Sequence, residues 1–111
     1  MQTSDLLAKH CVPCEGGTQP FNEEKIQAYM PGLSTTWVVA DGKKISHQFA
    51  FKNFPEAIAF VDKIVPIAEH EGHHPDLHIY YNNVTVELWT HAIGGLSEND
   101  FIMAVKIEAL V

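Results

Sequence analysis

The sequence predicts an α+β domain, with a four-stranded antiparallel sheet and three helices packed on one face. Two stretches alternate apolar and polar residues, and a two-residue turn breaks each of them once, which predicts two β-hairpins. Two other stretches repeat apolar residues at helical spacing. The predicted order is helix, strand, strand, helix, strand, strand, helix. A chain of 111 residues is long enough for one such domain with a single core.

The first helix is predicted to begin after Asn22, a good N-cap that two glutamates follow. It ends by Met30, because Pro31 disfavours helical geometry in the residue before it. A first hairpin follows over residues 37–52, with a tight turn at residues 41–42. The covered face of its second strand carries Ile45, His47, Phe49 and Phe51.

The second helix is predicted after Asn53, with Pro55 in its first turn, where proline is tolerated. One stripe of this helix is expected to pack on the sheet. The stripe consists of Ala57, Phe60, Val61, Ile64, Val65 and Ala68. Pro66 removes a backbone donor, so we expect a kink or an irregular last turn there.

The second hairpin is predicted over residues 76–89, with Asn82 and Asn83 as its turn, since asparagine tolerates left-handed backbone angles. The last helix follows Ser97, which forms a capping-box pattern with Asp100. Its apolar residues lie on nearly every side, and they are Phe101, Ile102, Met103, Val105, Ile107 and Leu110. Such a helix is usually covered by its own sheet and by a second subunit, so self-association is expected.

The composition is that of a soluble globular protein with a formal net charge of −7. The chain therefore lacks the basic footprint of a nucleic-acid surface or of a patch that binds anionic membranes. We find no membrane span and no signal-peptide core, so a cytoplasmic protein is expected. Residues 1–20 are expected to be a poorly ordered N-terminal segment, and residues 21–111 to form the single domain.

Two cysteines, Cys11 and Cys14, form a Cys-x-x-Cys pair in the N-terminal segment. A redox-active pair normally lies between a strand and a helix, and a zinc ribbon needs a second pair. Neither context is present in the sequence. Two interpretations stay open: an incidental pair, and a local metal or redox role together with His10.

Five of the seven histidines lie between residues 70 and 91. Residues 70–74 match the zinc-protease pattern H-E-x-x-H, but that pattern requires a continuous helix, which Gly72 and Pro75 interrupt. A different metal site, built from His73, His74, His78 and His91, is disfavoured because adjacent imidazoles do not easily aim at one ion. Solvated surface histidines are the ordinary alternative, and they fit His70 and His78.

His73, His74 and His91 are different, because the antiparallel return of the second hairpin brings His91 near His74. Imidazole titrates near neutral pH. Three imidazoles at one rim of a sheet, with no evident metal geometry, therefore suit acid–base chemistry.

The positions around these histidines form an extended pattern. They are Glu69, His73-His74-Pro75, Tyr81, Thr90-His91, Gly95-Leu96 and Asp100, with Trp37, Phe49, Phe51, Asn53-Phe54 and Phe60 upstream. This pattern resembles the signature of the pterin-4a-carbinolamine dehydratases over about residues 22–110. The fold of that family, a four-stranded antiparallel sheet with three helices, agrees with the prediction above.

The resemblance implies dehydration of 4a-hydroxytetrahydropterin to quinonoid dihydropterin in tetrahydrobiopterin recycling, after an aromatic amino acid hydroxylase. It implies His73, His74 and His91 as catalytic residues, with no metal and no cofactor. The substrate-binding residues it implies are Gly72, His73, His74, Trp89, Thr90, His91 and Ala92. A pterin substrate and a homodimer or homotetramer are the expected partners.

The chain departs from the pattern at Gly72 and Ala92, where many relatives carry acidic or polar residues, so the orientation and pKa of the histidines can differ. The acid and the base stay unassigned. Tyr81 is interpreted as a packing residue, and Asp100 either as a helix cap or as a partner of His91. The alternative functions are a non-catalytic binding module of the same fold, such as a dimerisation cofactor of a transcription factor, and a metal-dependent hydrolase.

Overall fold

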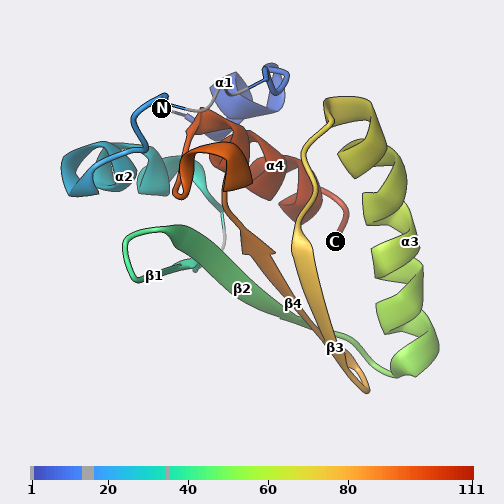
Figure 1. The fold of residues 1–111 in the computed structure, drawn as a ribbon. Coiled ribbons are helices and arrows are strands. Elements are labelled where there is room, and N and C mark those ends of the chain that lie inside the picture. The colour runs from blue at the N-terminus through green and yellow to red at the C-terminus, as the bar shows by residue number, and fades with distance from the viewer. Residues whose placement is uncertain (1, 14–16, 35) are drawn as a thin grey trace.

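The computed structural model describes residues 2–13, 17–34 and 36–111 (Figure 1). The helices are α1 (Thr3–Leu7), α2 (Glu23–Tyr29), α3 (Phe54–Glu71) and α4 (Glu98–Glu108), with short 3-10 turns η1 (Met30–Gly32) and η2 (His91–Ile93). The strands are β1 (Val38–Ala40), β2 (Lys44–Ala50), β3 (Asp76–Tyr80) and β4 (Asn83–Leu88). The predicted class and order are therefore confirmed. Helix α1 is an additional element, and Cys14 lies outside the described residues.

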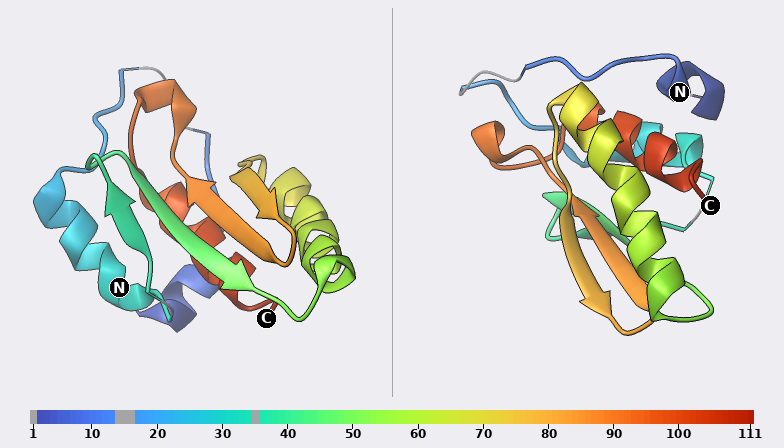
Figure 2. Two further views of the ribbon diagram at one scale, coloured as in Figure 1. Left: turned by 90° about the horizontal axis from the view of Figure 1, so that it is seen from below. Right: turned by 90° about the vertical axis from the view of Figure 1, so that its right-hand side faces the viewer.

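The four strands form one sheet in the order β1-β2-β4-β3, and each neighbouring pair is antiparallel. Helices α3 and α4 lie against the same face of this sheet (Figure 2). The buried side chains of the sheet alternate along β2 and β4, as the sequence predicts for a sheet with one covered face. They are Ile45, Phe49, Val84, Val86 and Leu88.

The turn of the first hairpin contains the predicted Asp41 and Gly42, and both have positive φ. Ala40 pairs with Lys44, so Lys43 also belongs to the turn and the prediction of a two-residue turn is wrong. In the second hairpin Tyr80 pairs with Asn83, so the turn consists of Tyr81 and Asn82, and the prediction of Asn82-Asn83 is wrong. Asn82 is held by a neighbouring segment, because its side-chain amide donates to the carbonyl oxygen of Phe51 at 2.8 Å. This displacement shifts the pairing by two residues, which leaves the same side chains on the covered face.

Tyr81 adopts a φ of 52° at the tip of the hairpin and is 68% exposed. The interpretation of Tyr81 as a packing residue is therefore wrong. A side chain at the outer end of a tight turn points away from the sheet, so it has no core to pack against.

Helix α3 begins where predicted, since Oδ1 of Asn53 accepts a hydrogen bond from the backbone N–H of Glu56 at 3.0 Å. The helix continues through Pro66 to Glu71. Most of the predicted stripe packs on the sheet, but Val65 is 52% exposed, so its assignment to the stripe is wrong. Val65 lies about 100° around the helix from the buried Ile64, which turns it towards solvent.

Helix α4 is buried on nearly all sides, and the capping box of Ser97 and Asp100 is confirmed. Helix α1 packs against α4, and its Leu6 is fully buried. The apolar surface of α4 is therefore covered within one chain, and it does not require a second subunit. Self-association stays a prediction. In the described part of the chain, no helix has both the length and the apolar character needed to cross a membrane.

Candidate active site

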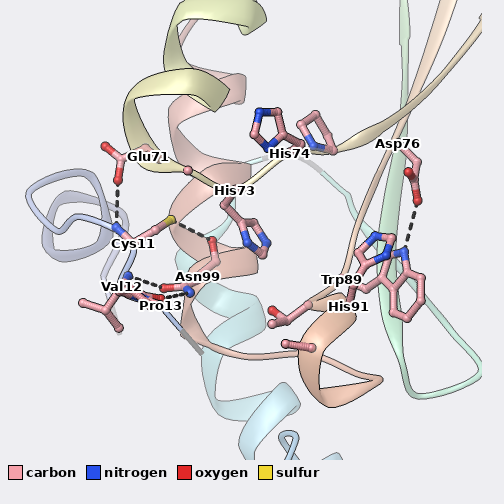
Figure 3. A pocket seen from close by; sticks show the side chains of 14 residues that line it. Cys11, Val12, Pro13, Glu71, His73, His74, Asp76, Trp89, His91 and Asn99 are labelled. Carbon is pink, nitrogen blue, oxygen red and sulfur yellow. Dashed lines mark hydrogen bonds between the residues drawn. The ribbon is translucent and has the colours of Figure 1, made fainter. Parts of the chain in front are cut away.

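A cavity of about 510 Å³ lies where the end of α3, the residues after β4 and the N-terminal segment meet (Figure 3). Its volume is within the usual range for small-molecule sites. All seven residues that the sequence analysis implicated in substrate binding line it. The full lining is Cys11, Val12, Pro13, Glu71, Gly72, His73, His74, Pro75, Asp76, Trp89, Thr90, His91, Ala92 and Asn99.

The histidine pair lies just beyond the end of α3. Gly72 takes a left-handed conformation with φ of 64°, which ends the helix and turns the chain. His70 therefore lies on the helix, while His73 and His74 lie outside it. The H-E-x-x-H pattern does not fall on one helix, so the rejection of a zinc protease site agrees with the structure.

His73 is held by the carboxylate of Asp100. Its Nε2 lies 2.6 Å from Oδ1 of Asp100, and the two side chains are only 11% and 0% exposed. The other oxygen of Asp100 accepts hydrogen bonds from the Thr90 hydroxyl and from the Ser97 backbone N–H, both at 2.9 Å. Asp100 therefore caps α4 as expected, but the histidine that it orients is His73, and the alternative with His91 is wrong.

His74 lies at the open side of the cavity, and its side chain is 61% exposed. Its Nε2 lies 2.5 Å from Oε2 of Glu69, which is 70% exposed. The pairing orients one nitrogen of His74. Because both groups are in contact with solvent, His74 can exchange protons with water, unlike the enclosed His73.

Trp89 and His91 form an aromatic wall of the cavity. Their ring centroids are 3.9 Å apart, with an interplanar angle of 30°. The indole N–H of Trp89 donates to Oδ2 of Asp76 at 3.0 Å, which fixes the plane of the ring (Figure 3). Asp76 lies at the start of β3 and Trp89 just after β4, so the antiparallel return places them together, as expected for His91. A flat heterocycle is a suitable ligand for such a wall.

The N-terminal segment supplies the opposite wall, which the sequence analysis did not identify. Asn99 on α4 binds both backbone polar groups of Val12, accepting from its N–H at 3.0 Å and donating to its carbonyl oxygen at 2.6 Å. Glu71 accepts a hydrogen bond from the backbone N–H of Cys11 at 2.7 Å. The Cys-x-x-Cys motif was the only feature of this segment that indicated a function. The hydrogen bonds that place the segment join residues 60 and 87 positions apart, and no local sequence pattern indicates them.

Burial raises the pKa of the Cys11 thiol to about 12, and the negative charge of Glu71 adds to this effect. The thiol is therefore protonated at neutral pH. Burial alone would raise the pKa of Glu71, but hydrogen bonds from Cys11 and His10 and the charge of Lys106 outweigh burial and hold it below its usual value. Glu71 is thus a fixed negative charge beside the cavity.

Two of the five clustered histidines do not line the cavity. His78 pairs with Glu87 on the sheet at 2.8 Å, and His70 lies on an exposed side of α3, as expected for both. His78, one of the four histidines of the disfavoured metal site, does not line the cavity, whereas His73, His74 and His91 do. In residues 2–13, 17–34 and 36–111, the group that brings possible metal ligands together is His10, His70 and Glu71.

The sequence model for pterin 4 alpha carbinolamine dehydratase matches residues 19–110. The chain belongs to this family. A Legionella pneumophila protein named "Putative pterin-4-alpha-carbinolamine dehydratase" is 49% identical over 110 residues, which cover 98% of this chain and 97% of the relative. A protein of the same name from Nitrosomonas eutropha is 45% identical over 107 residues, which cover 96% and 94%. Family membership supports a pterin carbinolamine dehydratase activity in general.

Solved structures agree on the fold. The crystal structure of a transcriptional coactivator/pterin dehydratase from Brucella melitensis matches with a TM-score of 0.77 and 33% identity, over 83% of this chain and 98% of that one. A pterin dehydratase-like protein described as a RuBisCO assembly factor in the alpha-carboxysome matches with a TM-score of 0.60 and 23% identity, over 69% and 90%. The second comparison shows a shared fold only.

Proposed function

We propose that this protein dehydrates 4a-hydroxytetrahydropterin to quinonoid dihydropterin by histidine acid–base catalysis, as a step of tetrahydrobiopterin recycling. The observation that carries the proposal is that His73, His74 and His91 line one cavity with an aromatic wall, in a chain of the dehydratase family. Cytoplasmic location and a homo-oligomeric state remain part of the same proposal.

The reaction requires one proton to be delivered and one to be removed. The C4a–O bond breaks, and the leaving hydroxide takes a proton from an acid and departs as water. A base removes the proton from the adjacent ring nitrogen, and the electron pair of that N–H bond forms the C=N double bond. No electrons enter or leave overall, so the step needs no oxidant or reductant, and imidazole can act as either acid or base near neutral pH.

The surroundings of the three histidines suggest different contributions. Asp100 accepts from Nε2–H of His73, which leaves Nδ1 as the nitrogen that can take up a proton. His74 is exposed and paired with Glu69, so it can return protons to solvent. His91 lies against Trp89, where it can contact the edge or face of a bound pterin. We propose that Trp89 and the backbone of Gly72, Thr90 and Ala92 bind the pterin ring.

The proposal is tested by following the decay of enzymatically generated 4a-hydroxytetrahydropterin in the presence of a chelator, with wild type, His74→Ala and His78→Ala. His78 is a matched control because it is also an exposed histidine paired with a glutamate, but outside the cavity. We expect wild type and His78→Ala to accelerate the decay and His74→Ala to lose most of the acceleration.

No acceleration over the spontaneous rate would overturn the dehydratase proposal. A non-catalytic binding module of the same fold would then be the favoured function. Of the two structural relatives, one is described as a transcriptional coactivator/pterin dehydratase and the other as a RuBisCO assembly factor. Acceleration that is lost with the chelator alone would instead indicate a metal-dependent reaction.

A further inference from the structure

A group of possible metal ligands lies where the end of α3 meets the N-terminal segment, beside a second cavity of about 400 Å³ that shares Glu71 with the candidate active site. We propose that His10, His70 and Glu71 form a binding site for a divalent transition-metal ion of the zinc class. One possible ligand atom from each of these residues lies within 4.8 Å of the other two. Zinc binding at these residues would be independent of the dehydratase activity, because the proposed reaction assigns no role to His10, His70 or Glu71.

The three side chains are close enough for small rotations to bring their ligand atoms to one ion. Nδ1 of His10 lies 2.9 Å from Oε2 of Glu71, and the ring centroids of His10 and His70 are 5.7 Å apart. Zinc binds imidazole nitrogen and carboxylate oxygen at about 2.0–2.2 Å, so tetrahedral ligand atoms lie roughly 3.3–3.5 Å apart. Both imidazoles are exposed, so side-chain rotation alone can bring them closer. Three protein ligands leave a fourth position for water.

Glu71 is the fixed member of the group, since its side chain is only 3% exposed. Its Oε1 accepts the hydrogen bond from the backbone N–H of Cys11, which leaves Oε2 facing His10. A partner that orients a ligating carboxylate in this way is common around metal ions. Lys106 lies 3.9 Å from the same oxygen, and its ammonium group also donates to the carbonyl oxygen of Leu7 at 3.0 Å. This positive charge opposes the binding of a cation at Glu71, and its hydrogen bond to Leu7 holds the ammonium group on the backbone of α1.

The proposed site joins two distant parts of the chain. His70 and Glu71 form the end of α3, and His10 belongs to the N-terminal segment, which passes over that end of the helix (Figure 2). The residues that follow His10 line the cavity of the candidate active site. Figure 3 shows the hydrogen bond there from the backbone N–H of Cys11 to Glu71. A bound ion would therefore attach this wall of the cavity to α3, and it would stabilise the folded protein by mass action.

The test is zinc binding by calorimetry and by thermal unfolding, on the full chain freed of metal. The variants are His10→Gln and His70→Gln, with His78→Gln as the control and His74→Gln to report on the other cavity. We expect wild type, His78→Gln and His74→Gln to bind one zinc ion per chain at this site and to unfold at a higher temperature with zinc. His10→Gln and His70→Gln should each weaken that binding at least about tenfold.

All substituted residues are exposed, so the variants are expected to fold. The proposal is wrong if His10→Gln and His70→Gln bind zinc as wild type does, or if wild type binds none. Loss of zinc binding only in His74→Gln would also overturn it, because the ion would then occupy the catalytic cavity.

Discussion

Nε2 of His73 lies 2.6 Å from Oδ1 of Asp100, and this pair joins the start of α4 to the loop that follows α3. The second oxygen of Asp100 accepts from Ser97 and Thr90, so a single buried carboxylate both caps a helix and orients a cavity histidine. Since Thr90 donates its only hydroxyl proton to Asp100, the 2.8 Å contact between the Thr90 and Ser97 hydroxyls must be donated by Ser97. Each donor and acceptor in this network is therefore defined, and Nε2 is the nitrogen of His73 that carries a hydrogen.

Asp100→Asn should lower dehydratase turnover at least about tenfold, because it replaces the carboxylate that accepts the hydrogen bond from Nε2 of His73 and orients the ring. Ser97→Ala is the control, since it costs about 1 kcal/mol of helix capping but keeps the contact between His73 and Asp100. Equal turnover in the two variants would show that Asp100 has only a structural role.

Trp89→Leu should raise KM about two- to tenfold, because the aromatic wall would be lost and aromatic contacts contribute about 0.5–1.5 kcal/mol each. Asp76→Ala should raise KM to a smaller extent, since it removes only the acceptor that fixes the indole. Steady-state kinetics measures both. Glu87→Ala is the control, because Glu87 pairs with His78 outside the cavity. A variant of Trp89 with unchanged KM would argue against pterin binding on this wall.

Asn99→Ala should raise KM, since it removes the two hydrogen bonds that hold Val12 in the wall of the cavity. Loss of these partly buried bonds should also lower the free energy of unfolding by about 1–3 kcal/mol. Asn22→Ala is the control, because it removes the cap of α2 at a cost of about 1 kcal/mol and lies outside the cavity. If both variants kept the wild-type KM, the N-terminal segment would not take part in substrate binding.

Tyr29→Phe should destabilise the protein at pH 6 but have less effect in acid. Burial alone would raise the pKa of Glu98, but hydrogen bonds from the Tyr29 hydroxyl and from Lys9 outweigh it and hold the pKa below its usual value. A lowered carboxyl pKa contributes stability above the unfolded-state pKa, and that stability is lost as the pH falls through the folded-state pKa.

The difference between wild type and Tyr29→Phe should therefore be about 1 kcal/mol at pH 6, with Glu98 partly exposed, and should shrink below about pH 4. Urea unfolding at several pH values measures this difference. Tyr80→Phe, at an exposed position on β3, is expected to behave as wild type. A difference that does not vary with pH would show that the ionised form of Glu98 is not what Tyr29 stabilises.

Tyr81→Gly should stabilise the protein by roughly 1 kcal/mol, because a residue other than glycine pays a steric cost at the positive φ of this turn. Tyr80→Gly, at the last residue of β3, should destabilise the protein, since glycine weakens a strand. Thermal or urea unfolding of both variants checks the sign. Destabilisation by Tyr81→Gly would mean that the tyrosine ring contributes contacts that outweigh the backbone strain.

Much of the fold could be predicted because the signals are local. Asn53 caps α3, Gly72 interrupts the H-E-x-x-H pattern, and alternation along β2 and β4 identifies the covered face, each through contacts with near neighbours in the chain. The turn at Tyr81 could not be predicted, because the hydrogen bond between Asn82 and Phe51 comes from a segment 31 residues away. Local preference favours Asn82-Asn83, because Tyr81 pays a steric cost at positive φ, and the distant contact of Asn82 opposes that preference.

The sequence by itself determined that this is an α+β chain whose histidines gather at one end of a hairpin. The spacing of His73, His74 and His91 and the period of the strands contain that information. Only the tertiary structure decided that Asp100 binds His73, that Cys11 and Val12 line the cavity, and that α1 covers α4. These contacts join residues far apart in the chain, so they depend on how the elements pack rather than on any local pattern.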